Sequence, residues 1–532
     1  MVTANKIERP ALDTRQLGVK SLTVGSLTGG SRVLGLVREI VFSYTFGASL
    51  IADAFFVAFR IPNFFRRLLA EGAFAQAFVP VLARYQGNKQ FDELQLFVRT
   101  IAGNFGLSLL VICALGVALA PALITVFTFG AWHGDEQQGL ATSLLMIMFS
   151  YLGLISFTAF LGSILNSFGR FSIPSFSPIV LNVAIILAAL LGSITADQPV
   201  YLVAWSVIVA GVVQLLLHLP SLIKLRLFKL PKLDWKHVGV QQLLKLLGPA
   251  VYAASAGQIN ILVGTGLAAL LTTGSVSWLY YADRLIELPV GMIAIAVQTV
   301  VLPRFSYLYD RKKYDEYRAG VRWSLELGIL LGVPATLGLS LLAVPLVATI
   351  FYHGEFNSID LQMVARALQA FSIGVLPLML VRMLAPAFFA QQNTKTPFKY
   401  TTISVATNII VSVSLFKLIG HVGIAIATSV AAIVHIVLLV QGLIKRNVLS
   451  LNRELYFVCL RVGGAGIAMS LFLVLLRPEQ VYWFESSAWD RVVWLFLLVS
   501  TGTITYFGIC FILGLRPRQF IGQRDQRIRE SH

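Results

Sequence analysis

The sequence has few charged residues for its length. Of its 532 residues, 13% are charged and 57% are hydrophobic, and the mean hydropathy is +0.78. Ordinary soluble domains carry about 25% charged residues, so this scarcity excludes a soluble globular protein. The net charge of +17 would suggest a nucleic-acid partner in a soluble chain. Here the Lys and Arg residues fall in alternate loops, which is typical of membrane proteins, so we expect no nucleic-acid binding.

Cysteines and enzyme motifs are also scarce. Cys113, Cys459 and Cys510 are the only cysteines, and all lie inside apolar runs without the spacing of a metal or redox site. The sequence has no P-loop, no HExxH and no G-x-S-x-G motif. We therefore expect no enzyme and no cofactor. Because no ATPase module is present, transport would have to use the membrane potential, an ion gradient or the substrate's own gradient, with the coupling ion left open.

Apolar runs near the bilayer-spanning length of about 20 residues are abundant. Fourteen can be placed, at about 21–45, 52–70, 98–127, 138–166, 173–195, 199–223, 242–271, 277–303, 322–351, 363–391, 398–418, 421–444, 456–476 and 490–514. The predicted fold class is an all-α polytopic membrane protein with about 14 transmembrane helices. The basic loops follow the even-numbered runs, so both termini are expected to be cytoplasmic. The polar N-terminus predicts no cleaved signal peptide.

The chain also repeats itself at a fixed distance. Three pairs of segments match at offsets of 224, 222 and about 223 residues: VFTFG at 126–130 with IFYHG at 350–354, MFSYLG at 148–153 with AFSIGV at 370–375, and GRFSIP ending at Pro174 with NTKTP ending at Pro397. Each copy holds six runs, an even number, so the two lobes should have the same topology. The predicted division is a cytoplasmic segment (1–20), an N-lobe (21–230), a C-lobe (231–447), two extra C-terminal helices (448–515) and a basic cytoplasmic tail (516–532).

The hairpin from Ser31 to Gly72 carries far more charge than a membrane anchor should. A charge at mid-bilayer costs about 2.5–3.5 kcal/mol on insertion scales, so it is retained mainly where a wet cavity needs it. Ser31, Arg32, Arg38 and other small or polar residues fit within an arc of about 140° on the first helix. We expect this face to meet an anion. Glu39 could instead neutralise Arg38 or Arg32.

The second helix of the hairpin runs from Asp53 to a basic pair, Arg66 and Arg67, and is interrupted by Pro62. Asn63 could either cap the broken half-helix or bind substrate. Arg66 and Arg67 could bind substrate, or could reach the cytoplasmic interface as arginines at helix ends often do.

A second charged cluster opens the eighth run, in WLYYADRLIELP. Asp283 and Glu287 are four residues apart, and Arg284 lies three before Glu287, so the three side chains can meet on neighbouring helix faces. They form either a self-neutralised structural trio or a binding site in which Arg284 adds a cation for an anionic head group.

Four segments carry a resemblance to a known family: SRVLGLVRE, ADAFFVAFRIPNFFRRLLAEGAFAQAFVPVLARY, FSIP and SVSWLYYADRLIELP. Over nearly its whole length the chain resembles the MurJ/MviN family of lipid II flippases. These belong to the multidrug/oligosaccharidyl-lipid/polysaccharide exporter (MOP) superfamily, with a MATE-like fold of two six-helix lobes plus two further helices.

The resemblance implies transfer of undecaprenyl-pyrophosphate-linked peptidoglycan precursor from the cytoplasmic to the periplasmic leaflet of the bacterial inner membrane, for cell-wall synthesis. Partners would be lipid II, membrane phospholipids and, as an open question, the cell-wall synthesis machinery. The family's site residues match Arg32, Arg38, Asp53, Arg284 and the Arg66–Arg67 pair. Residues 448–515 would form a groove for the lipid tail.

Residue chemistry and resemblance lead to the same hypothesis. A pyrophosphate carries about two negative charges, and arginine forks match its oxygens better than lysine does. We expect Arg32 and Arg38 from one lobe and Arg284 from the other to hold it in a central cavity, with Asp53 pairing with an arginine in one state. Two rivals stay open: a structural subunit of the cell-wall machinery, and an exporter of cationic drugs, which should have an acidic cavity instead.

Overall fold

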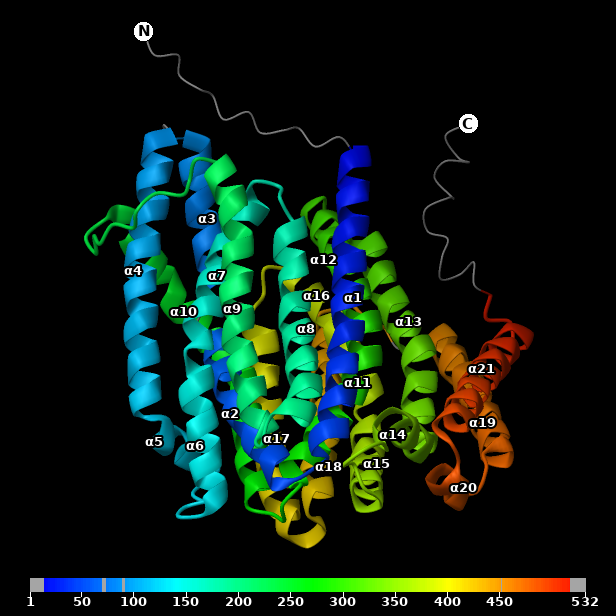
Figure 1. Cartoon of the computed structure of the whole chain (residues 1–532). Helices are drawn as coiled ribbons and strands as arrows, with labels where there is room; N and C mark the ends of the chain where they lie inside the picture. Colours follow the sequence, from blue (N-terminus) through cyan, green and yellow to red (C-terminus); the bar gives the residue numbers. More distant parts are fainter. Residues whose placement is uncertain (1–13, 69–72, 89–90, 451, 517–532) are drawn as a thin grey trace. The chain divides into compact units, whose positions relative to one another are not determined.

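The computed structural model describes residues 14–68, 73–88, 91–450 and 452–516, and their regular secondary structure is entirely helical. Most of the predicted segments 1–20 and 516–532 lies outside these ranges. The chain divides into two compact units, residues 1–276 and 277–532, and each is described by itself (Figure 1).

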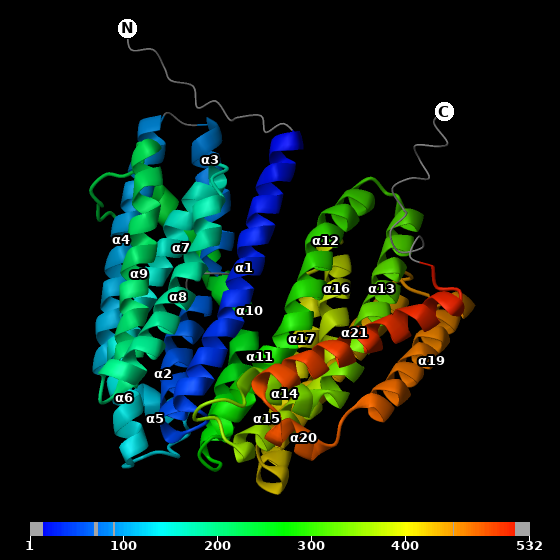
Figure 2. The same ribbon diagram turned by 45° about the vertical axis from the view of Figure 1, so that its right-hand side comes forward.

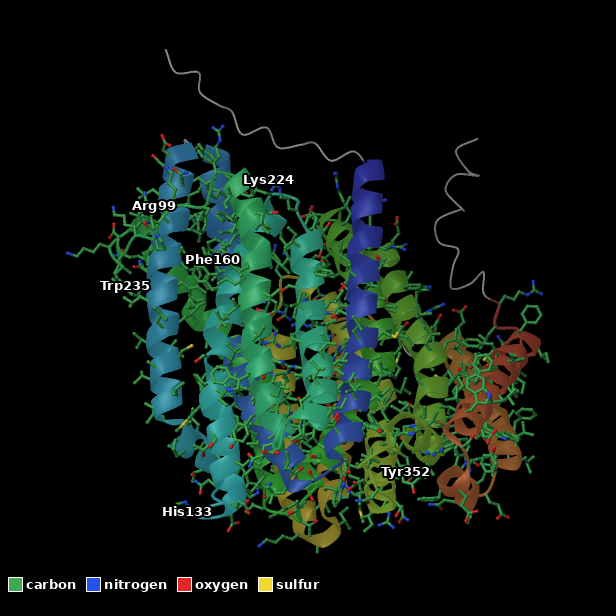
Figure 3. The ribbon with its side chains drawn as sticks, in the orientation of Figure 1. Arg99, His133, Phe160, Lys224, Trp235 and Tyr352 are labelled. Atoms are coloured by element: carbon green, nitrogen blue, oxygen red, sulfur yellow. The ribbon has the colours of Figure 1, made fainter. Side chains whose placement is uncertain are left out.

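The first unit contains ten helices within its described residues. They are α1 (Thr14–Phe46), α2 (Leu50–Arg66), α3 (Ala73–Asn88), α4 (Phe91–Ala118), α5 (Ala120–Phe127), α6 (Glu136–Phe149), α7 (Tyr151–Ser167), α8 (Ser172–Thr195), α9 (Pro199–Lys224) and α10 (Val238–Ala269). Phe160 of α7 is fully buried in its core, with its ring 5.2 Å from that of Phe78 in α3 and 6.1 Å from that of Phe105 in α4 (Figure 3).

The second unit follows the same plan and adds a hairpin. Its helices are α11 (Ser275–Pro289), a π-helical turn (Val290–Ala294), α12 (Ile295–Asp310), α13 (Tyr314–Leu341), α14 (Ala343–Phe351), α15 (Ser358–Ser372), α16 (Val375–Ala390), α17 (Lys395–Ile419), α18 (His421–Lys445), α19 (Arg453–Leu476), α20 (Gln480–Glu485) and α21 (Ala488–Ile512). Helices α19 and α21 lie side by side (Figure 2).

The internal repeat is visible in the helix boundaries. Each helix from α1 to α9 has a counterpart from α10 to α18 that begins 222 to 225 residues later. Even a local irregularity recurs: one long helix breaks at Leu119 between α4 and α5, and its counterpart breaks at Leu342 between α13 and α14. In both copies a proline follows the break within the first turn of the new helix, where its missing N–H costs nothing. The predicted repeat is confirmed.

The number of membrane spans differs from the number predicted. Ten described helices are long and apolar enough to cross a membrane, or eleven if the bent pair α15 and α16 is one span. The tenth predicted run corresponds to this bent pair. The first, second and seventh runs match none of these spans, although their described residues are almost all helical. α2 has only 17 residues, and α1 carries Arg32, Arg38 and Glu39 within its length. Fourteen spans therefore stays a prediction.

By packing, α10 belongs to the first unit, although the sequence repeat assigns its residues to the predicted C-lobe. Val240 and Leu243 at its start are buried in the same core as Phe97 and Phe160. The packing division therefore falls after Val276, whereas the sequence division falls after residue 230. The predicted lobes remain repeat units defined by the sequence.

The added hairpin is fastened to the second unit by polar bonds as well as apolar packing. The buried Tyr506 hydroxyl of α21 donates to the Leu330 carbonyl of α13 at 2.8 Å. Arg491 is 7% exposed and donates to the carbonyls of Ala348 and Tyr352 at the end of α14, each at 3.0 Å. Figure 3 labels Tyr352 at this junction.

Candidate functional site

The polar face of α1 packs against α8. Arg38 donates to Asn182 Oδ1 at 3.1 Å and forms an ion pair with Glu39, which is 2% exposed. Asn182 Nδ2 in turn donates to the Ser31 carbonyl at 3.0 Å. Part of this face therefore meets a neighbouring helix, whereas the arc alone predicted that all of it meets an anion. Of the two partners considered for Glu39, the ion pair formed is with Arg38.

Arg32 differs from Arg38 although it is on the same helix. Its side chain is half-buried, and among the described residues it has no hydrogen-bonding or ion-pair partner. An arginine cannot lose its charge in a protein, and a partly desolvated guanidinium with open donors costs free energy. Of the two arginines predicted on α1, Arg32 is therefore the one whose donors all lack a protein partner among the described residues.

Asn182 is a residue that sequence reasoning missed. It is 7% exposed on α8 and bridges Arg38 to the α1 backbone. Its signal in the sequence was an amide inside an otherwise apolar run, at VLNVA, eight residues after Pro174. A polar side chain in such a run needs a partner, and here that partner is the arginine of the neighbouring helix.

Replacing Asn182 with leucine should impair the protein through Arg38. The similar volume of leucine preserves most of the α1–α8 packing, but Arg38 loses its amide acceptor and the Ser31 carbonyl loses a donor. We expect activity to fall about tenfold in a transport assay, with normal protein levels in the membrane. Asn182→Asp, which keeps an acceptor for Arg38, should retain more activity than Asn182→Leu. Equal losses in the two variants would show that Arg38 does not depend on this contact.

Asp53 fixes the turn that ends the first unit. It lies in the first turn of α2, where Ser49 is the N-cap, and is 2% exposed. Its Oδ2 accepts a hydrogen bond of 2.7 Å from the backbone N–H of Gly274. Gly274 has φ +94°, a conformation that favours glycine. The carboxylate therefore holds the tight turn between α10 and α11, a role that the sequence did not predict.

Pro62 does not interrupt α2, contrary to our expectation. The helix runs continuously from Leu50 to Arg66. Within it, Asn63 Nδ2 donates to the Phe59 carbonyl at 2.8 Å. Asn63 Oδ1 also accepts from Arg66 Nε at 3.1 Å. Because α2 is unbroken at Pro62, Asn63 caps no half-helix there; that it binds substrate stays a prediction. Arg67 is exposed.

Arg60 of α2 was not predicted as a site residue. Its Nη1 donates to Thr265 Oγ1 at 2.7 Å, and Thr265 is 1% exposed on α10. Arg60 lies seven residues after Asp53, two turns along α2. Arg60 therefore binds near the end of α10, and Asp53 binds the turn that follows it.

In the second unit, Arg284 of α11 is held by its own helix. Its Nη1 forms an ion pair with Glu287 Oε2 at 2.6 Å, and its Nη2 donates to the Tyr280 hydroxyl at 3.1 Å. The guanidinium carbon also lies 4.9 Å from the centre of the Tyr280 ring. Asp283 is half-buried beside it. The predicted pairing of Arg284 with Glu287 is confirmed, while the side chains remain 32% and 47% exposed.

A protein-family model matches most of the chain. The model of the family described as "Lipid II flippase MurJ" matches residues 42–494. The chain belongs to this family. The matched range includes Asp53, the Arg66–Arg67 pair and Arg284, and it begins after Arg32 and Arg38.

Curated relatives extend the match to nearly the full chain. The chain is 38% identical over 511 residues to the "Probable lipid II flippase MurJ" of Vibrio cholerae, covering 94% of this chain and 97% of that protein. It is 36% identical over 507 residues to the "Lipid II flippase MurJ" of Burkholderia cenocepacia, covering 94% and 98%. The predicted family resemblance is confirmed.

Solved structures agree on the fold. A lipid II flippase MurJ in an inward closed conformation matches with a TM-score of 0.76 and 26% identity, covering 91% of this chain and 99% of that one. A multidrug resistance MATE transporter of the MOP superfamily, in an inward-facing conformation, matches with a TM-score of 0.65 at 15% identity, covering 80% and 98%. The second likeness shows the fold alone, and it confirms the MATE-like fold class.

Proposed function

We propose that this protein moves lipid II from the cytoplasmic to the periplasmic leaflet of the bacterial inner membrane by alternating access, and so supplies peptidoglycan synthesis. The observation that carries the proposal is Arg32, a half-buried arginine without a partner among the described residues, on the same face as Arg38. An unpaired cation inside a hydrophobic helix is retained for a ligand of opposite charge.

In this proposal Arg32 and Arg38 on α1 and Arg284 on α11 bind the pyrophosphate and its neighbouring groups. A planar guanidinium can donate two parallel hydrogen bonds to phosphate oxygens, which gives both strength and orientation without a metal. The ion pair between Arg284 and Glu287 is suited to exchange, because ion pairs as exposed as this one contribute at most about 1 kcal/mol to stability. A phosphate could therefore replace Glu287 at little cost.

The other predicted site residues take supporting roles. Asn63 orients Arg66 through a 3.1 Å hydrogen bond, and the Ser31 carbonyl anchors Asn182 beside Arg38. Arg66 and Arg67 lie at the end of α2 that we propose to face the cytoplasm, where the head group would enter. Asp53 holds the turn before α11, and Asp283 adjoins Arg284.

The repeat supports a rocking mechanism, since transporters built from two repeats commonly move one against the other around a fixed site. Its energy would come from the membrane potential or an ion gradient, with no cofactor. Both termini would lie in the cytoplasm. Residues 448–515 would hold the lipid tail, consistent with apolar side chains such as Leu475 and Ile512, which are 83% and 80% exposed.

Depleting the protein from cells should trap lipid II in the inner leaflet. An externally added lytic enzyme that cleaves only outer-leaflet lipid II would report how much becomes accessible. We expect accessible lipid II to collapse while total lipid II accumulates, and the wild-type chain to restore it. If outer-leaflet lipid II stays normal while wall synthesis fails, the protein acts as a structural subunit or moves another molecule.

A further inference from the structure

The connection between α9 and α10 contains a basic segment that the proposed function does not use. We call residues 226–236 the strap. Residues 227–234 have no regular secondary structure, and the backbone follows α4. Gln95 Nε2 donates to the Arg226 carbonyl at 2.6 Å, and Arg99 Nε donates to the Leu230 carbonyl at 2.8 Å. The N–H of Lys232 donates back to the Arg99 carbonyl at 3.1 Å.

The far end of the strap is fixed more tightly still. Asn104 is 3% exposed, and its side chain exchanges two hydrogen bonds with the backbone of Asp234, at 2.9 and 3.1 Å. At Gly103 a Cβ atom would lie 2.3 Å from the Lys232 carbonyl oxygen, so only glycine permits this approach. Between Gln95 and Asn104, α4 rises by about 13 Å. The strap therefore runs along the first part of α4, a helix that is long and apolar enough to span the membrane.

The outer side of the strap mixes apolar and basic side chains, all of them exposed. Phe228, Leu230, Leu233 and Trp235 are 56%, 82%, 58% and 47% exposed, and they alternate with three exposed lysines, Lys229, Lys232 and Lys236. Figure 3 shows Trp235 and Arg99 on the outer flank of α4, with neighbouring side chains projecting away from the helices. A solvated loop would have no reason to hold large apolar side chains outward on a backbone that is fixed by five hydrogen bonds.

We propose that the strap is a membrane-surface site that binds the head groups of anionic phospholipids. Tryptophan is favoured at the depth of the head groups, phenylalanine and leucine enter the boundary between head groups and acyl chains, and lysines extend from there to lipid phosphates. Basic segments next to the cytoplasmic end of a span are attracted to the anionic lipids of that leaflet. In the orientation proposed above, the strap lies on that side, because α4 begins there at Phe91.

A depth-sensitive probe on the strap tests the proposal. The full-length chain, with Cys113, Cys459 and Cys510 replaced by alanine, would carry Leu233→Cys labelled with an environment-sensitive fluorophore. It would be placed in nanodiscs of phosphatidylcholine with a minority of phosphatidylglycerol, with the acyl chains of one lipid or the other brominated. We expect each molecule of brominated phosphatidylglycerol to quench the fluorescence at least about twice as strongly as a molecule of brominated phosphatidylcholine.

The combined variant Lys229→Gln, Lys232→Gln and Lys236→Gln should lose this preference while the fluorophore stays quenchable. The matched control Arg311→Gln, Lys312→Gln and Lys313→Gln removes the same charge from the loop between α12 and α13. This control should keep the preference for phosphatidylglycerol. Equal quenching by the two lipids in the parent protein would overturn the anionic specificity. If neither lipid quenches the fluorophore, the strap does not bind the membrane. The same conclusion follows if the fluorophore becomes shielded from water only after a soluble protein is added.

Discussion

Replacing Arg32 with alanine should abolish translocation of lipid II without unfolding the protein. Arg32 has no partner among the described residues, so its removal breaks no hydrogen bond there and should change the free energy of unfolding by no more than about 0.5 kcal/mol. The proposed loss falls on ligand binding alone, since the guanidinium supplies donors that alanine lacks. In cells depleted of the wild-type chain, the variant should reach normal levels in the membrane and leave lipid II inaccessible to the external lytic enzyme.

Two further variants separate charge from geometry at this position. Arg32→Lys keeps the charge but lacks the planar fork, so it should restore accessible lipid II only in part. Arg84→Ala removes an exposed arginine of α3 that has no partner among the described residues, and it should behave as wild type. An Arg32→Ala protein that restores full accessibility would remove Arg32 from the site and leave its half-buried charge unexplained.

Patterns within short stretches of the sequence were enough to predict the fold and part of the candidate site. The repeat offset near 223 followed from three short motifs, and nine pairs of helices keep it. The pair between Arg284 and Glu287 followed from helical spacing, because residues three apart share a face. Such predictions succeed because a helix fixes the distances between its own residues before any tertiary contact forms.

Contacts between distant segments could not be predicted in the same way. Arg38 meets Asn182 across 144 residues, and Arg60 meets Thr265 across 205. The periodicity of one helix does not show which neighbour the helix will pack against. A polar face can therefore be predicted to be a ligand site although part of it contacts another helix. For the same reason α10 packs with the first unit although the repeat groups it with the second.

The Asp53 carboxylate has two roles that an experiment can separate. The sequence suggested an acid that pairs with an arginine in one state of the transport cycle, while the structure shows a hydrogen bond from the Gly274 N–H at 2.7 Å. Asparagine separates the two roles, because its Oδ1 can still accept that bond although the side chain carries no charge. If the turn is what matters, Asp53→Asn should retain most activity and Asp53→Ala should lose it.

The loss in Asp53→Ala should appear in stability as well as in transport. A buried N–H left without an acceptor costs about 1–3 kcal/mol, so the purified variant should melt at a lower temperature than wild type. Asp53→Asn should melt close to wild type, and Asp197→Ala, which removes an exposed acid before α9, should match wild type in both assays. If Asp53→Asn melts normally but leaves lipid II in the inner leaflet, the negative charge itself is required. The transient pair with an arginine then becomes the better explanation, because an amide could hold the turn but could not attract a guanidinium with equal strength.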